Sequence, residues 1–195
     1  MRARGALTAA DWNDWYAQGR NGRVVSNAEI DQFYQRVRPA ARMTAVDIEC
    51  GLGAWTRQIA RFGVRTTGYD YSSEALNGAR RNTPFSGKVG FAYWDLNADG
   101  APLTIPLRSL DIASFHLSLE FLDGHRVMTD VKRWLRPGDL VYVMARIGAT
   151  EPDDERQRGL SQTAFEGLTE GWGSSTPYSL GKSYQCMVLR EPVGC

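Results

Sequence analysis

The sequence predicts an α/β fold built on one doubly wound, mostly parallel sheet of six to seven strands, with a C-terminal antiparallel strand or hairpin. Two observations lead to this prediction. Short apolar segments alternate with segments whose apolar residues recur at helical spacing, and this β-α-β alternation is typical of a parallel sheet with helices on both faces. The chain has 195 residues, which suits a single domain at ~150 residues per domain.

An N-terminal arm, residues 1–25, precedes the alternation and is expected to form an aromatic lid. Trp12, Trp15 and Tyr16 fall at positions i, i+3 and i+4 of this arm, so they share one face of a helix. These side chains either close over a bound ligand or pack on the body of the domain, and both interpretations stay open. Residues 26–195 are expected to form the single domain.

The domain is expected to begin with a helix over residues 26–37. Ser26 and Glu29 have the spacing of a capping box, and Pro39 follows the last apolar position of the helix. Ile30, Phe33, Tyr34 and Val37 form the apolar stripe of this helix.

Five strands and three helices make up the alternation, and apolar runs and capping residues set their limits. The strands are expected at residues 43–48, 64–69, 88–94, 110–117 and 140–147. The helices are expected over residues 54–62, from the cap Ser72 to Arg81, and after the cap Asp123. Pro137 and Gly138 are expected to end the third helix. Such a Rossmann-like order places all five strand ends at one edge.

The C-terminal part is expected to complete the sheet with antiparallel strands. A charged surface loop is predicted over residues 151–159, followed by a helix over residues 163–168 whose capping box is Thr163 and Glu166. Residues 184–189 alternate like a terminal strand, and residues 172–179 are expected to pair with it through a turn at Gly181.

Composition excludes several classes of protein. The formal charge of +1 lacks the basic excess of a nucleic-acid binder, and no apolar run approaches the ~20 residues of a membrane span. Three cysteines, Cys50, Cys186 and Cys195, show neither disulfide nor metal-ligand spacing. We therefore expect a cytoplasmic protein with no metal, no nucleic-acid partner and no membrane partner, present as a monomer or homodimer.

Acidic residues end three successive strands, and glycines follow the first of them. Asp47 precedes Gly51 and Gly53, Asp70 comes 23 residues after Asp47, and Asp95 comes 25 residues after Asp70. One strand-helix-strand step of this length brings neighbouring strand ends side by side, where an acid typically binds a ribose diol. Each acid alone is as readily a helix cap, but together they indicate a nucleotide-type site.

A nicotinamide dinucleotide is disfavoured as the ligand. Its fingerprint is Gly-x-Gly-x-x-Gly, and the third glycine position is Thr56 here. The sequence instead resembles the class I S-adenosylmethionine-dependent methyltransferases of small-molecule type over residues 26–190. The segments that carry the resemblance, in order, are VDIECGLG, TTGYDYS, FAYWDLN, LDIASFHLSLEFL and RWLRPGDLVYVMARI.

The resemblance implies S-adenosylmethionine as cofactor, S-adenosylhomocysteine as product, and a role for each matching residue. The methionine part would lie beside the glycine turn, the ribose and adenine at the next two strand ends, and the sulfonium near the fourth. The residues carried over are Asp47, Gly51 and Gly53 for methionine, Asp70 for ribose, Tyr71, Trp94, Asp95 and Leu96 for adenine, and His116 and Leu117 for the sulfonium.

Two positions depart from the family pattern. Glu49 stands where the family has its first glycine, and its side chain either crowds the methionine part or places a carboxylate near the cofactor's positive charge. Asp139 replaces the second glycine of the turn before the fifth strand, a position that Asp tolerates. Glu49 therefore also leaves open a non-catalytic S-adenosylmethionine-binding protein.

Two side chains after the fourth strand are candidates for a general base, His116 and Glu120. His116 is as readily a hydrogen-bonded core histidine, and Glu120 is as readily an arginine partner. His125 is expected at the surface. The expected reaction is methyl transfer to oxygen or nitrogen of a small metabolite, with a place in bacterial specialised metabolism suggested by analogy only. A nicotinamide-dependent oxidoreductase is the remaining alternative.

Overall fold

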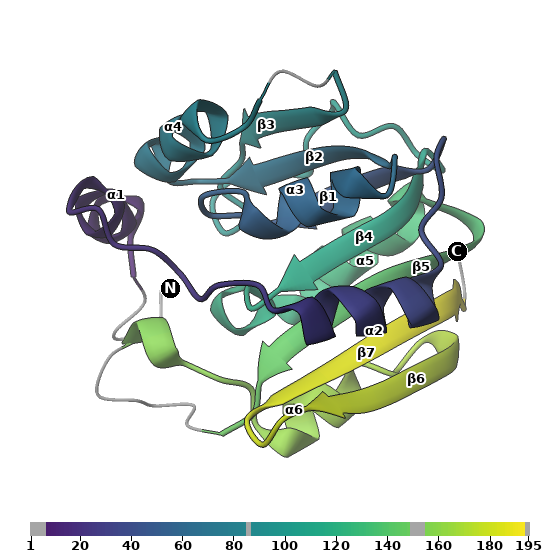
Figure 1. The fold of residues 1–195 in the computed structure, drawn as a ribbon. Coiled ribbons are helices and arrows are strands. Elements are labelled where there is room, and N and C mark those ends of the chain that lie inside the picture. Colours follow the sequence, from purple (N-terminus) through teal and green to yellow (C-terminus); the bar gives the residue numbers. More distant parts are fainter. Residues whose placement is uncertain (1–6, 85–86, 149–154, 194–195) are drawn as a thin grey trace.

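The computed structural model describes residues 7–84, 87–148 and 155–193 and contains one seven-stranded sheet (Figure 1). The strand order is β3-β2-β1-β4-β5-β7-β6. Strands β1 to β5 are parallel, and β7 runs antiparallel to both β5 and β6. The strands are β1 (Thr44–Ile48), β2 (Arg65–Asp70), β3 (Val89–Tyr93), β4 (Leu110–His116), β5 (Leu135–Arg146), β6 (Trp172–Leu180) and β7 (Tyr184–Pro192). The predicted fold class, with its C-terminal hairpin, is confirmed.

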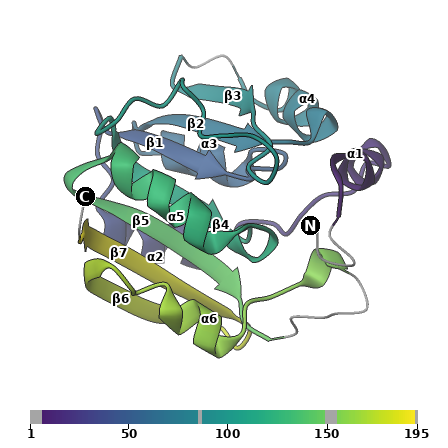
Figure 2. The same cartoon turned by 180° about the vertical axis from the view of Figure 1, so that it is seen from behind.

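Helices cover both faces of the sheet, as the alternation predicted. Helices α2 and α3 lie on one face, and α5 and α6 lie on the other (Figures 1 and 2). The helices are α1 (Ala9–Ala17), α2 (Asn27–Val37), α3 (Ala54–Arg61), α4 (Ser73–Arg81), α5 (Gly124–Trp134) and α6 (Gln162–Gly167), with short 3-10 helices η1 (Leu119–Phe121) and η2 (Glu155–Gln157). One apolar cluster lies between each face of the sheet and the helices that cover it, so there are two clusters among the described residues.

The central strands are apolar on both sides because both sides are covered. Ile48, Phe115 and Val143 are fully buried and stand at the same level of β1, β4 and β5. A buried parallel sheet requires such continuous apolar runs. The register therefore places the residues that follow Ile48, Phe115 and Val143 together at one edge of the sheet.

Capping residues begin several helices where the sequence predicted them. Ser26 and Glu29 form the expected capping box of α2, and the side chains of Ser72 and Asp123 accept hydrogen bonds from the first turns of α4 and α5. The arm contains an additional capping box, in which Thr8 and Asp11 begin α1. Each such cap satisfies backbone N–H groups that a helix start leaves without partners.

Two predicted boundaries are wrong. Helix α6 is capped by Ser161, whose hydroxyl accepts from the Ala164 N–H, so Thr163 lies inside the helix and forms no capping box. Helix α5 ends at Trp134, and Leu135 already begins β5, so Pro137 and Gly138 do not end the helix. Ser161 caps α6 two residues before Thr163. In α5 the backbone is already extended at Leu135, before the chain reaches Pro137.

Some predictions fall wholly or partly outside the described residues. The predicted loop 151–159 is described only from residue 155, where η2 begins, and Cys195 lies outside the described part. Within the described ranges no helix has the length and apolar character to cross a bilayer. No three metal-binding side chains come together in that same part of the chain.

Candidate functional site

A cavity of about 530 Å³ opens at the carboxyl ends of β1, β4 and β5. Helix α1 lies near this edge, on the side to which the arrows of the parallel strands point (Figure 1). Among the residues that line the cavity are nine that the sequence singled out, namely Trp12, Trp15, Tyr16, Asp47, Glu49, Gly51, His116, Leu117 and Glu120. Ligands of doubly wound sheets bind at this edge, in cavities of roughly 300–1,000 Å³.

The turn between β1 and α3 has a backbone that favours glycine. Gly51 and Gly53 have φ angles of +52° and +71°, in the left-handed region. A Cβ on Gly51 would lie 2.7 Å from the Tyr16 hydroxyl, and one on Gly53 would lie 2.5 Å from the Phe91 ring. Gly51 therefore faces the cavity and α1, whereas Gly53 is covered by β3 and does not line the cavity.

Glu49 occupies the same turn with φ of +57°, a conformation that costs a residue with a Cβ about 1–2 kcal/mol. Its Oε1 atom is buried and has no hydrogen-bond partner in the structure. Burial, followed by the nearby charges of Asp70 and Asp95, raises the pKa of Glu49 well above its usual range. A strained residue with an unsatisfied carboxyl at a cavity wall is the kind of outlier that marks a functional site.

Asp47 lies deeper, at the end of β1. It is 1% exposed and accepts a hydrogen bond of 2.6 Å from the hydroxyl of Thr56, the residue that stands at the third glycine position of a dinucleotide fingerprint. Burial raises the pKa of Asp47 to about 7. The wall formed by Asp47 and Glu49 thus holds two carboxyl groups whose ionised forms would be stabilised by a cation.

Asp70 is placed at the end of β2 as predicted, but it organises the turn and does not line the cavity. Its two carboxylate oxygens accept backbone hydrogen bonds of 2.8 Å from Gly51 and Ser72. Burial raises the pKa of Asp70 to about 6, against the lowering effect of these hydrogen bonds. The Tyr16 hydroxyl would lie 2.7 Å from a Cβ on Gly51, whose N–H donates to Asp70. Desolvation, followed by the charge of Asp70, raises the pKa of Tyr16 well above its usual range.

The aromatic side chains of α1 form one wall of the cavity. The rings of Trp12 and Tyr16 stack with centroids 5.9 Å apart, and Trp15 packs edge-on against Tyr16. Asn13 holds the helix in place, because its Oδ1 accepts from the Ser72 hydroxyl at 2.7 Å and from the Glu74 N–H at 3.2 Å. The arm therefore lies against the start of α4 and the turn after β1.

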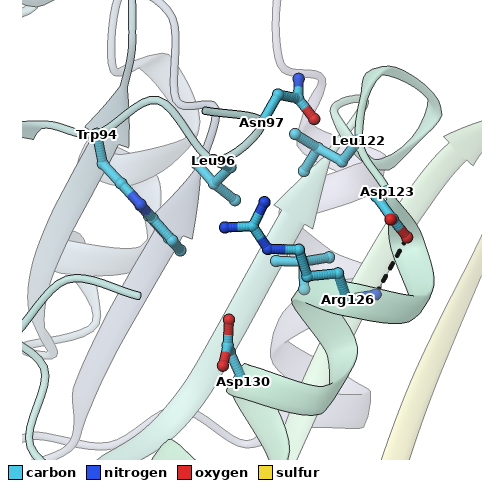
Figure 3. A pocket seen from close by; sticks show the side chains of 8 residues that line it. Trp94, Leu96, Asn97, Leu122, Asp123, Arg126 and Asp130 are labelled. Carbon is cyan, nitrogen blue, oxygen red and sulfur yellow. Dashed lines mark hydrogen bonds between the residues drawn. The ribbon is translucent and has the colours of Figure 1, made fainter. Parts of the chain in front are cut away.

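The residues expected to contact an adenine ring lie elsewhere. Trp94 is 4% exposed, donates its indole N–H to the Gly100 carbonyl and packs edge-on against other aromatic rings of the core. Trp94 and Leu96 line a separate cavity of about 10 Å³ beside α5 (Figure 3), which is room for about one water molecule. Asp95 accepts from two backbone N–H groups of its own turn, and Tyr71 follows β2 outside the cavity lining.

His116 forms the centre of a buried polar cluster. Its Nε2 atom lies 3.1 Å from Glu29 Oε1, and its ring stacks on Trp55 with centroids 4.6 Å apart. Glu29 is fully buried and also accepts from Arg23 at 2.5 Å and from the hydroxyl and N–H of Ser26, each at 2.7 Å. Burial opposes the charge of Glu29, but these hydrogen bonds outweigh it and hold the pKa of Glu29 below its usual range.

His116 is therefore a neutral imidazole beside an ionised carboxylate. Burial lowers its pKa, although Glu29 acts in the opposite direction. A neutral imidazole that donates Nε2–H to Glu29 keeps Nδ1 as its acceptor nitrogen. This tautomer, oriented by a buried carboxylate, is the arrangement by which a histidine accepts a proton.

Glu120 and Arg146 lie on the β4–β5 side of the cavity. Glu120, in η1, is 8% exposed, and its Oε2 atom has no hydrogen-bond partner in the structure. Burial raises its pKa to about 7, although the positive charge of Arg146 lowers it. Leu117 directly follows β4 and has a φ of +59°, in the left-handed region, so the chain turns sharply at the end of this strand. His125 is exposed on α5, as expected.

Sequence reasoning missed several residues of this site. Glu29 was identified only as a helix cap, and Trp55 only as part of a helix. The cationic residues of the lining were not identified at all, namely Arg23, Arg57, Arg146, Arg156 and Arg158. No local motif marks these positions, because they come from four different segments of the chain.

The chain also shows similarity to known proteins. Residues 46–143 match a protein family described as a methyltransferase domain. This segment runs from β1 into β5 and contains the glycine turn, Asp70, His116 and Glu120. No curated protein matches the chain in sequence.

Solved structures with similar folds come from distant relatives. A phosphoethanolamine N-methyltransferase 2 of Haemonchus contortus, in complex with phosphomonomethylethanolamine and S-adenosylhomocysteine, has a TM-score of 0.72 at 15% identity; the match covers 97% of this chain and 58% of that one. An S-adenosylmethionine-dependent methyltransferase of Aquifex aeolicus has a TM-score of 0.69 at 13% identity, with 83% and 88% covered. One from Mesorhizobium loti has a TM-score of 0.64 at 17% identity, with 83% and 100% covered. The chain thus spans little more than half the length of the Haemonchus protein.

Proposed function

The chain belongs to the methyltransferase domain family, and on this premise we propose that it transfers a methyl group from S-adenosylmethionine to an oxygen or nitrogen atom of a small metabolite. The observation that carries the proposal is the Glu49 carboxyl, which lines the large cavity beside Gly51 with an unsatisfied oxygen. The proposal is further supported by the site's position at the carboxyl ends of parallel strands, where doubly wound folds bind ligands. Structures of similar fold also include complexes with this cofactor and its product.

The residues of the β1 turn fit the positive part of this cofactor. When bound, S-adenosylmethionine supplies an activated methyl group on a positively charged sulfur. Asp47 and Glu49 are carboxyl groups in a desolvated wall, where ionisation is unfavourable without a compensating cation. Gly51 leaves the turn without a side chain toward the cavity. Glu49 thus replaces the family's first glycine without closing the cavity, which still includes Gly51 among its lining residues.

The remaining proposed cofactor contacts depend on the position of the arm, because Tyr16 lies against Gly51. Asp70 keeps lone pairs beyond its two backbone hydrogen bonds, so it remains our candidate for the ribose, provided that Tyr16 moves aside. Tyr71 and Asp95 remain candidates for the adenine side. Trp94 and Leu96 face the smaller cavity, and the geometry gives them a packing role. We propose that Trp12, Trp15 and Tyr16 act as a lid over the donor.

The residues at the end of β4 provide the proton chemistry. Methyl transfer is an in-line displacement, so alignment and the exclusion of water supply much of the rate. An acceptor hydroxyl or ammonium group must also lose a proton. His116 is neutral and oriented by Glu29, and it therefore accepts that proton, whereas Glu120 is the second candidate base on the same wall.

Calorimetry with S-adenosylmethionine and S-adenosylhomocysteine tests the proposal. We expect micromolar binding of both ligands to the full chain. Absence of heat and of any thermal shift with either ligand would contradict the proposal. His125→Ala, on the exposed face of α5, is the matched control and should bind as the parent does.

Glu49 supports one alternative, a non-catalytic binder of the same cofactor. The strained carboxyl at the first glycine position is the observation behind it. Formation of S-adenosylhomocysteine from a panel of small hydroxyl and amine acceptors separates the two functions. Turnover by the parent chain supports the enzyme, whereas turnover that occurs only in Glu49→Gly supports the binder.

A further inference from the structure

We propose that the methyl acceptor carries an anionic group, a carboxylate or a phosphate, which Arg146 binds at the end of β5. This inference rests on the proposed function, because it concerns the acceptor of the same site. Five arginines line the cavity, and two of them, Arg23 and Arg146, lie over the ring of Tyr184, the residue that pairs with Arg146 across β5 and β7. The carboxyl groups of Asp47 and Glu49 enter the same cavity from the end of β1, and Arg146 enters it from the end of β5.

Arg146 is an arginine of this lining with spare donors. Among the described residues it forms no ion pair. Its Nη2 donates a hydrogen bond of 3.4 Å to the Tyr184 hydroxyl, and its Cζ lies 5.6 Å from the centroid of that ring. Arg23, by contrast, is paired with the buried Glu29. A guanidinium has five N–H donors in a planar fork that matches carboxylate and phosphate oxygens. Arg146 therefore keeps most of its hydrogen-bonding capacity for a ligand.

The order of the strands sets the distance between the carboxyl groups at the end of β1 and Arg146 at the end of β5. Strand β4 lies between β1 and β5, and His116 stands beside Met144, two residues before Arg146. Strands in a sheet are about 4.8 Å apart, so the ends of β1 and β5 are separated by roughly 10 Å. The acid wall, the proposed base and Arg146 thus follow one another across the cavity. A small acceptor held by its anionic group at Arg146 would place its nucleophile near His116.

Glu120 does not neutralise this arginine. The two side chains lie on the same wall, but they form no ion pair within 4 Å. Burial raises the pKa of Glu120 to about 7, so this carboxyl is partly protonated at neutral pH. Arg156 also lines the cavity, where its Nη2 donates to the Asp11 carbonyl of α1.

Equilibrium binding of three probes of similar shape tests the inference. Benzoate, phenyl phosphate and benzamide are titrated into the full chain by ligand-observed NMR, with and without S-adenosylhomocysteine. We expect at least one anion to bind at least tenfold more tightly than benzamide. Whichever of benzoate and phenyl phosphate binds more tightly shows whether the site prefers a carboxylate or a phosphate. In Arg146→Gln this preference should fall to less than threefold, while affinity for S-adenosylhomocysteine stays unchanged. Arg133→Gln, an exposed arginine on α5, should retain the full preference.

Two results would overturn the inference. One is equal binding of benzamide and both anions to the parent chain, and the other is an anion preference that survives Arg146→Gln. Failure of the cofactor to bind contradicts the proposed function instead, because the anion titration without cofactor still reports on Arg146. Folding of each variant is checked by its thermal unfolding midpoint, and Arg146→Lys provides a second variant that retains charge without the planar fork.

Discussion

The proposed donor and acceptor halves of the site, each made of cavity-lining residues and the residues that hold them in place, are built in different ways. The donor half, which we define as Asp47, Glu49, Gly51 and Asp70, comes from one continuous strand-turn-helix-strand segment. The acceptor half, defined as Arg23, Glu29, His116 and Arg146, comes from the arm, α2, β4 and β5. Glu29 and His116 alone are 87 positions apart in the chain. The proposed donor half is therefore a local motif, whereas the proposed acceptor half depends on tertiary contacts.

The charges of the two halves also differ in how they are satisfied. The acceptor half contains a buried carboxylate with four hydrogen bonds, and its pKa is held below the usual range. Glu49 in the donor half has an orphaned oxygen and a raised pKa. A buried group with all its hydrogen bonds adds to the stability of the fold, whereas a buried group without a partner destabilises the fold until a ligand provides one. The two halves should thus respond differently to substitution.

The largest effect is expected for His116→Ala in the acceptor half. Removal of a general base slows proton transfer by about 10²–10⁴-fold, and the donor half lies on other strands. We expect kcat to fall by about 100-fold or more while the Kd of S-adenosylmethionine changes less than threefold. Initial rates and calorimetry measure the two quantities. An equal loss in both would make His116 a binding residue and remove the distinction between the halves.

Glu29→Ala should have the next largest effect, on stability. The change leaves Arg23 and His116 without their buried partner and removes the capping box of α2, so we expect a loss of about 3 kcal/mol in the free energy of unfolding. Urea unfolding at pH 7 measures this loss. Because the folded pKa of Glu29 is depressed, its stabilisation is present above the unfolded pKa of about 4.3 and lost as pH falls. A difference between parent and Glu29→Gln that does not shrink below pH 4 would contradict this account.

Asp70→Ala tests the donor half with a smaller expected effect. The loss of a carboxylate that holds the Gly51 N–H and accepts ribose hydroxyls should weaken cofactor binding by roughly 1–3 kcal/mol. Calorimetry with S-adenosylhomocysteine reports the change. Ser179→Ala, at an exposed position of β6, is the control. Unchanged affinity in Asp70→Ala would mean that the ribose binds elsewhere.

Glu49→Gln should have the smallest effect and the most selective one. Loss of the negative charge should weaken S-adenosylmethionine binding about tenfold, or about 1.4 kcal/mol, and weaken S-adenosylhomocysteine less because that product has no positive sulfur. The raised pKa values of Asp47 and Glu49 mean that the ionised forms, which favour the cation, increase as pH rises. We therefore expect affinity for S-adenosylmethionine to increase from pH 6 to pH 8. A Kd independent of pH, or an equal loss for both ligands, would exclude this charge effect.

Prediction from sequence succeeded where the signal was periodic or local. Alternating apolar segments were enough for the sheet and its helices, and the acids and glycines at the strand ends lie where the sequence placed them, while their role toward a cofactor stays a prediction. The expected place of Trp94 beside an adenine ring stays a prediction, while its indole N–H donates to the Gly100 carbonyl and its ring packs in the core. The predicted start of α6 was wrong because another residue satisfied the same need. Thr163 had capping-box spacing, but Ser161 already capped α6.

The sequence by itself determined the order of strands and helices, the glycine turn after β1 and the carboxyl groups at the strand ends, because each depends on neighbours within one structural unit. Only the tertiary structure decided that Glu29 holds His116, that α1 covers Gly51, and that Arg146 faces the same cavity as Glu49. The physical reason is that contacts between distant segments depend on how the layers pack, and no spacing along the chain records that packing.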